Sequence, residues 1–195
     1  LSKWCGAGGW RLGTFTVPPD LHWLLEAMAA VASETYTSVS APIQYAGVRA
    51  FSGGLEIERY LQQSRRVLRA LAAMFAARLR EAGARVAEPE GGFYVFPDFS
   101  PLRKALKARG VTTGAGLCER LLTDTGIAIL PGVAFGRPVD ELTARLAFVD
   151  FDGARALVAA EAVPVDRELD ADFLEQYCVN VTRAAARLTT WLAGP

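Results

Sequence analysis

Residues 1–13 run Leu1-Ser2-Lys3-Trp4-Cys5-Gly6-Ala7-Gly8-Gly9-Trp10-Arg11-Leu12-Gly13. The stretch combines a lysine, a glycine-rich loop, and an arginine eight positions after the lysine. A lysine amine forms an imine with an aldehyde when burial or neighbouring cations keep it partly neutral. An arginine can grip a phosphate through two parallel hydrogen bonds. The pattern therefore predicts a site for one compound that carries both an aldehyde and a phosphate.

The glycines also suggest a dinucleotide-binding loop, but the surrounding sequence excludes it. No apolar strand precedes the glycines, no helix with the required glycine follows them, and no acidic residue stands at the distance needed for a ribose. The lysine-containing motif of phosphate-binding loops is absent as well. A single lysine is most often a plain surface charge, so the hypothesis depends on the rest of the chain.

Residues 1–13 resemble the lysine-attachment signature of class I/II aminotransferases, which are fold type I pyridoxal phosphate (PLP) enzymes. The matching residues are Leu1, Ser2, Lys3, Gly6, Ala7, Gly9, Arg11, Leu12 and Gly13. Four later segments are similar to this family in order and spacing, namely residues 37–46, 91–97, 126–136 and 145–148. The resemblance covers nearly the whole chain except residues 153–170, which we expect to be an insertion.

The resemblance implies a role for three residues. Lys3 would be the Schiff-base lysine and proton shuttle, Arg11 would bind the cofactor phosphate, and Arg145 would hold the substrate α-carboxylate. The cofactor would be pyridoxal 5'-phosphate, the substrates an amino acid and a 2-oxo acid, and the enzyme a homodimer. The family's other cofactor ligands lie before the lysine, so we expect a C-terminal fragment, inactive alone, of a parent about twice as long.

The fold expected from the same resemblance is α/β, with a small α+β domain. Residues 1–54 would be the tail of the PLP-binding large domain, residues 55–82 an interdomain helix, and residues 83–195 the small C-terminal domain. Hydrophobic periodicity supports the helix over 55–82, because apolar residues recur there at three- and four-residue steps.

Pattern also predicts the individual elements. Strands are expected at 10–17, 84–88, 91–96, 126–130 and 143–151, where aromatic and β-branched residues gather between turn residues. Helices are expected after an Asp20 cap, at 44–51, at 113–123, and at 171–192 with Asp170 near its start. Gly83 is placed to end the long helix.

Composition limits the classes of function. Lys plus Arg and Asp plus Glu number 21 each, so the zero net charge gives no basic footprint for nucleic acid or for a membrane surface. One histidine and three widely spaced cysteines offer almost no metal ligands and no disulfide framework. No apolar run spans a bilayer and no secretory leader is seen, so we expect a cytoplasmic protein.

Other functions remain open at this point. A C–S lyase, a decarboxylase or an acyltransferase of the same fold type would share Lys3 and Arg11. A non-catalytic fragment or dimerisation module would bind no cofactor. No arginine occurs in residues 35–44, where some dicarboxylate-specific relatives place a second clamp, which disfavours aspartate as the donor. Tyr94 fits core packing better than a ligand role, and neither Cys5 nor His22 shows a sign of chemistry.

Overall fold

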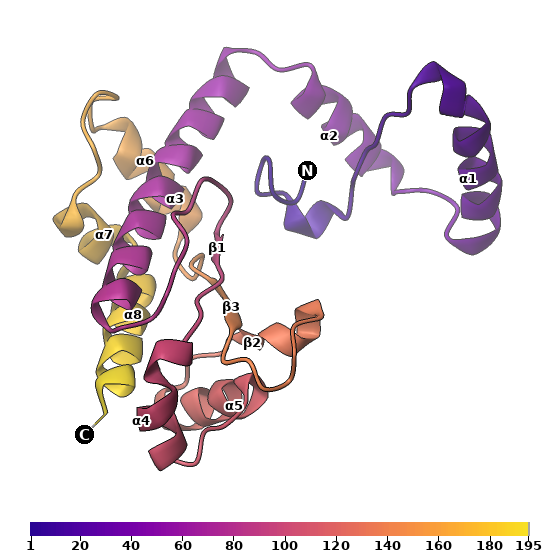
Figure 1. The fold of residues 1–195 in the computed structure, drawn as a ribbon. Coiled ribbons are helices and arrows are strands. Elements are labelled where there is room, and N and C mark those ends of the chain that lie inside the picture. Colours follow the sequence, from indigo (N-terminus) through magenta and orange to yellow (C-terminus); the bar gives the residue numbers. More distant parts are fainter. Residues whose placement is uncertain (195) are drawn as a thin grey trace. The chain divides into compact units, whose positions relative to one another are not determined.

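The computed structural model describes residues 1–194 and divides into two compact units, of which the first is Leu1–Gln62 and the second begins at Gln63. Figure 1 shows a mostly helical chain with one small sheet. Within the described residues, no helix has the length and apolar character needed to cross a membrane.

The first unit consists of helices and irregular backbone. Its elements are η1 (Gly8–Trp10), η2 (Pro19–Leu21), α1 (His22–Thr35), α2 (Ala41–Phe51) and the start of α3. Helix α2 confirms the predicted helix and begins three residues earlier, where Pro42 occupies the first turn, a position that tolerates its missing N–H.

Two predictions for the first unit are wrong. Residues 10–17 form no strand, because a strand needs a paired neighbour and none of residues 1–62 is in a strand. Asp20 does not cap α1. It lies in η2, and the residue at the cap position of α1 is Leu21, which makes no side-chain cap.

Helix α3 (Leu55–Glu81) confirms the long helix predicted from periodicity. Glu56 lies in its first turn and Arg80 in its last, so both charges complement the helix dipole. Gly83 ends the helix with φ +90°, and the N–H of Ala84 donates to the carbonyl of Leu79 at 3.0 Å. This left-handed glycine turn satisfies a carbonyl that the helix end would otherwise leave unpaired.

The sheet of the second unit has three short antiparallel strands in the order β1-β3-β2. They are β1 (Tyr94–Val95), β2 (Leu130–Pro131) and β3 (Ala144–Ala147), and Tyr94 pairs with Ala147 while Leu130 pairs with Arg145. β1 and β3 lie inside predicted strands, whereas β2 overlaps the strand predicted at 126–130 only at Leu130. All three are shorter than predicted, since each outer strand pairs with β3 over only two residues. The strand predicted at 84–88 is wrong, because only Arg85 forms a bridge, to Asp98.

The rest of the regular structure in the second unit is helical. Its elements are η3 (Ser100–Leu102), α4 (Arg103–Ala108), α5 (Gly114–Thr125), η4 (Gly132–Phe135), α6 (Gly153–Glu161), α7 (Ala171–Tyr177) and α8 (Val179–Ala193). Asp170 caps α7 as predicted, accepting from the N–H of Phe173 at 2.9 Å. The single helix predicted at 171–192 is wrong, because the backbone of Cys178 leaves the helical region and divides it into α7 and α8.

The core of the second unit joins α3, α5 and α8 to the sheet. Its fully buried members include Leu71, Leu79, Phe99, Leu121, Leu142, Phe148 and Leu188. Burial alternates along β3, with Leu146 buried and Ala147 exposed, and Phe148 directly after the strand is buried. One face of β3 therefore belongs to the core, and Arg145 belongs to the opposite face.

Gly132 is expected to tolerate no side chain. A Cβ at Gly132 would overlap the Thr143 hydroxyl oxygen, and it would lie 3.1 Å from Thr143 Cβ and 3.2 Å from Thr143 O. The N–H of Gly132 also donates to that carbonyl at 2.8 Å, which fixes the approach. Because overpacking forces backbone shifts, Gly132→Ala should destabilise the chain by about 1–3 kcal/mol in urea unfolding.

Gly153→Ala is the matched control, because no atom lies within 4 Å of a Cβ at Gly153. Gly153 begins α6, and alanine favours a helix more than glycine does, so the unfolding midpoint of Gly153→Ala should be unchanged or slightly raised. Equal unfolding midpoints for Gly132→Ala and the wild type would contradict the packing described here.

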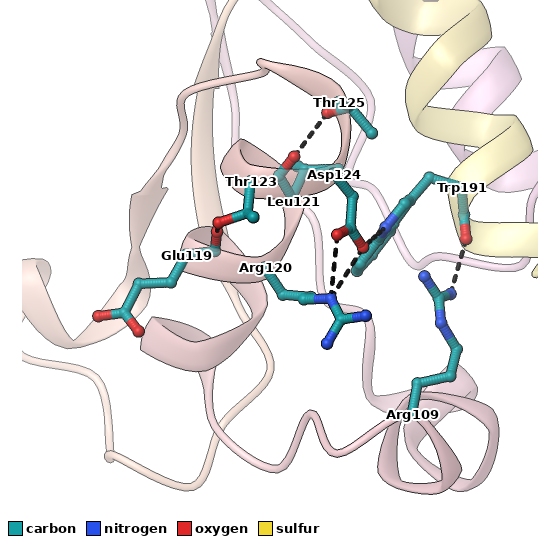
Figure 2. A network of polar contacts seen from close by, with 8 residues as sticks. All are labelled: Arg109, Glu119, Arg120, Leu121, Thr123, Asp124, Thr125 and Trp191. Carbon is teal, nitrogen blue, oxygen red and sulfur yellow. Dashed lines mark hydrogen bonds and ion pairs between the residues drawn. The ribbon is translucent and has the colours of Figure 1, made fainter.

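A polar network ties α5 to α8 (Figure 2). The indole N–H of Trp191 donates to Asp124 Oδ2 at 2.9 Å, and Arg120 binds the same carboxylate through Nε at 2.9 and 3.1 Å. Arg109 donates to the carbonyl of Trp191 at 2.7 Å, with its guanidinium carbon 4.1 Å from the Trp191 ring centroid. The hydrogen bond from Trp191, followed by that from Arg120, holds the pKa of Asp124 below its usual range.

Trp191→Phe should lower the melting temperature by a few degrees, and the difference should depend on pH. A carboxyl whose folded pKa is lowered adds stability above its unfolded pKa, about 3.9, and loses it as pH falls through the folded pKa. Because Trp191 is the largest cause of the Asp124 shift, the gap to the wild type should be widest near neutral pH and narrow below about pH 4.

Trp23→Phe is the control for this experiment, because Trp23 is 63% exposed on α1. Its melting temperature should follow the wild type at every pH. A gap for Trp191→Phe that stays constant between pH 7 and pH 3 would show that the Asp124 hydrogen bond contributes nothing to stability.

Candidate active site

Lys3 lies in a compact loop that its own backbone closes. The N–H groups of Cys5 and Ala7 both donate to the carbonyl of Leu1, at 3.2 and 3.3 Å. The N–H of Trp10 donates to Ala7 at 3.1 Å, and the amino group of Leu1 donates to the carbonyl of Leu12 at 3.2 Å. These bonds hold residues 1–12 together and leave the Lys3 side chain at the surface of the described chain.

Tyr60 fastens this loop to the start of α3. Its hydroxyl donates to the carbonyl of Cys5 at 2.7 Å. Burial, and to a lesser degree the neighbouring Cys5, raises the pKa of Tyr60, so the hydroxyl stays protonated and able to donate. Gly6 beside it has φ +66°, and a Cβ there would lie 2.9 Å from the Tyr60 oxygen. The loop therefore requires glycine at position 6 for two independent reasons.

Arg11 ends the same loop in an uncommon backbone conformation. Its φ is +53°, which is left-handed, a region that non-glycine residues rarely adopt. One guanidinium nitrogen donates to the carbonyl of Gly8 at 3.1 Å, while the side chain is exposed. Such strained residues cluster at ligand sites. Lys3 and Arg11 thus share one loop and supply an amine and a guanidinium, the two groups that an aldehyde and a phosphate need.

Arg145 lies in the second unit, at the centre of β3. Its neighbours Ala144 and Leu146 are buried in the core, so the strand holds its backbone firmly. Its guanidinium carbon is 4.3 Å from the ring centroid of Tyr94 and 4.6 Å from that of Phe135. The side chain is half-buried.

Sequence reasoning missed the two rings around Arg145. Tyr94 was expected to pack in the core, and Phe135 was noticed only as part of a family-like segment. The pairing register places the rings there, because Tyr94 lies across from Ala147 and Arg145 lies across from Leu130, next to η4, and that register is known only from the structure. The contact of Tyr60 with the lysine loop had no signal in the sequence, since 55 positions separate it from Cys5.

Metal-ligand clusters, cysteines and His22 are the other candidate reactive groups of the described residues. Among residues 1–194, no cluster of three or more His, Cys, Asp or Glu side chains could hold a metal ion. Cys118 and Cys178 are buried free thiols, and burial raises the pKa of each to about 11. His22 begins α1 at the surface, and its Nδ1 lies 3.6 Å from a carboxylate oxygen of Glu26.

The sequence matches known proteins over most of its length. The model of the family described as "Aminotransferase class I and II" matches residues 1–160. The match ends at residue 160, inside the segment 153–170 that was expected to be an insertion.

Curated relatives include an asparagine–oxo-acid transaminase of Streptococcus mutans, 29% identical over 71% of this chain and 33% of the relative. An aspartate/prephenate aminotransferase of Cereibacter sphaeroides is 33% identical over 66% of this chain and 31% of the relative. The chain therefore spans about a third of the length of the curated relatives it matches.

Solved structures share the fold. An aspartate aminotransferase from Thermotoga maritima aligns with a TM-score of 0.63 at 22% identity, covering 98% of this chain and 38% of that one. An aromatic aminotransferase from Pyrococcus horikoshii aligns with a TM-score of 0.66 at 23% identity, covering 98% of this chain and 40% of that one. The helical chain with its small antiparallel sheet thus matches part of the aspartate aminotransferase fold.

Proposed function

The chain belongs to the class I and II aminotransferase family, which is PLP-dependent, and we propose that it is the C-terminal part of an enzyme that transfers an amino group between an α-amino acid and a 2-oxo acid. The single observation that carries the proposal is the lysine loop, in which one hydrogen-bonded turn presents both Lys3 and Arg11. We propose further that the whole enzyme is a cytoplasmic homodimer.

The donor set of the loop suits the cofactor. Lys3 would hold it through an imine, and Arg11 would bind its phosphate through two charge-assisted hydrogen bonds. When bound, PLP supplies the electron sink that makes the Cα–H of an amino acid acidic. The amine of Lys3, when not bonded to the cofactor, would carry that proton between the amino-acid Cα and the cofactor carbon.

Arg145 would orient the substrate. A guanidinium binds a carboxylate with two parallel hydrogen bonds, which fixes both the position and the plane of the amino acid. Because every α-amino acid and 2-oxo acid carries this carboxylate, Arg145 would serve both half-reactions.

The surface of the first unit supports a longer parent. Helix α1 buries no residue. Large apolar side chains of α1, α2 and the adjoining loops are exposed, including Trp23, Val31, Tyr36, Tyr45, Val48 and Phe51. Soluble proteins rarely leave so much apolar surface uncovered. We propose that residues 1–54 complete a large domain whose other part precedes Lys3, that residues 55–82 are the interdomain helix, and that residues 83–195 form the small domain.

Product analysis with the full-length protein that carries this chain tests the proposal. The protein, loaded with PLP, is incubated with an α-amino acid panel and 2-oxoglutarate, and products are identified by mass spectrometry. Glutamate and the 2-oxo acid of the donor should form in equal amounts. Carbon dioxide without glutamate would indicate a decarboxylase, and a thiol or sulfide with ammonia and a 2-oxo acid, again without glutamate, would indicate a lyase; either result would contradict the proposal.

A further inference from the structure

The charge of Arg145 has no internal counter-ion. Within residues 1–194, its guanidinium contacts the rings of Tyr94 and Phe135 and forms neither an ion pair nor a hydrogen bond. Other arginines of the same unit differ, since Arg120 pairs with Asp124 and Arg137 pairs with Glu141. A half-buried cation without a carboxylate beside it is costly unless a ligand or another polar group completes its environment.

We propose that Tyr94 and Phe135, together named the aromatic cradle, are positioning residues that hold the guanidinium of Arg145 ready for a substrate carboxylate. The inference rests on the proposed function and deepens it. The cradle would touch neither the cofactor nor the reacting atoms, and it acts through Arg145.

The physical basis is the way a guanidinium uses aromatic rings. A ring attracts the cation through its negative face, whereas the N–H donors radiate in the plane of the guanidinium. An acidic neighbour would hold Arg145 equally well, but it would neutralise the charge and occupy the donors. Aromatic contacts restrict the side chain and leave the donors available, which reduces the ordering entropy that carboxylate binding must otherwise offset.

The fold fixes both rings of the cradle. Tyr94 lies in β1 and pairs with Ala147, two residues from Arg145 on the same strand. Phe135 ends η4, where Gly136 turns with φ +76° and donates to Val133 at 3.2 Å. Phe96 supports Phe135 edge-on, with ring centroids 5.7 Å apart and an interplanar angle of 81°. Phe135 remains 42% exposed, so a ligand can reach this side of the strand.

The test compares Phe135→Leu with Phe135→Tyr in the full-length, PLP-loaded protein. Leucine keeps apolar bulk but removes the ring, so KM for both the amino acid and the 2-oxo acid should rise about 3- to 30-fold, with a smaller change in kcat. Tyrosine keeps the ring and should restore KM to within about twofold. Tyr177→Leu removes a ring beside Arg155 and should leave both constants unchanged.

A second readout needs no catalysis. In the 195-residue chain, ring currents should shift the Arg145 side-chain protons in the NMR spectrum, and Phe135→Leu should reduce that shift while Phe135→Tyr preserves it. If the wild type transaminates but Phe135→Leu leaves KM unchanged, the inference is overturned. It is also overturned if Phe135→Leu and Phe135→Tyr raise KM equally. A wild type that does not transaminate would overturn the proposed function itself.

Discussion

Lys3→Ala is expected to reduce transamination by the full-length protein about a thousandfold or more, because it removes both the imine-forming amine and the proton carrier. Proton transfer by a positioned group alone contributes about 10²- to 10⁴-fold. The lost activity should appear in kcat, since Arg145 would still bind the substrate carboxylate. The measurement is the rate of 2-oxo acid formation at saturating amino acid.

The chain offers matched controls for Lys3, because its only other lysines are Lys104 and Lys107. Both belong to α4 and are exposed, so alanine at either position should leave the rate within about twofold of the wild type. A Lys3→Ala protein with wild-type activity would remove Lys3 from the mechanism.

Arg145→Lys should lower kcat/KM for amino acids about 100-fold, mostly through KM. Lysine keeps the positive charge but loses the planar, two-pronged donor, and one charge-assisted hydrogen bond is worth about 1.5–3 kcal/mol. The contact with the aromatic cradle also weakens, because an ammonium lacks the flat face that lies over Tyr94 and Phe135. Steady-state kinetics with both substrates measure the effect.

Arg155→Lys is the control for that substitution. Arg155 also lies near an aromatic ring, with its guanidinium carbon 5.4 Å from the Tyr177 centroid, but it belongs to α6 rather than to β3. Its kinetic constants should match those of the wild type. If Arg145→Lys raised KM no more than Arg155→Lys does, another residue would bind the carboxylate.

Helices could be predicted from the sequence better than strands, and the reason is physical. Helix α3 depends on hydrogen bonds within its own residues and on a local stop at Gly83, so its bounds follow from the sequence nearby. A strand depends on a distant partner, and residues 10–17 lack one within the first unit. The break at Cys178 was equally hidden, because the apolar stripe continues through it and only the backbone angles reveal it.

For the candidate site, too, the sequence predicted what is local and missed what depends on tertiary contacts. Lys3 and Arg11 were found because eight positions of sequence join them in one loop. The contact from Tyr60 to Cys5 joins residues 55 positions apart, and the contact from Phe135 to Arg145 depends on how β2 pairs with β3. No local pattern encodes such contacts. The roles of Lys3, Arg11 and Arg145 remain predictions, which kinetic measurements on variants and trapping of the imine can test.

Trapping the imine is the most direct test that Lys3 carries the cofactor. The full-length protein is mixed with PLP, reduced with borohydride, digested and mapped by mass spectrometry. The phosphopyridoxyl group should be found on the peptide that contains Lys3, and neither Lys104 nor Lys107 should carry it in significant amount. A parent protein that binds PLP but shows no adduct on Lys3 would contradict the assignment of this chain to the lysine-bearing half of an aminotransferase site.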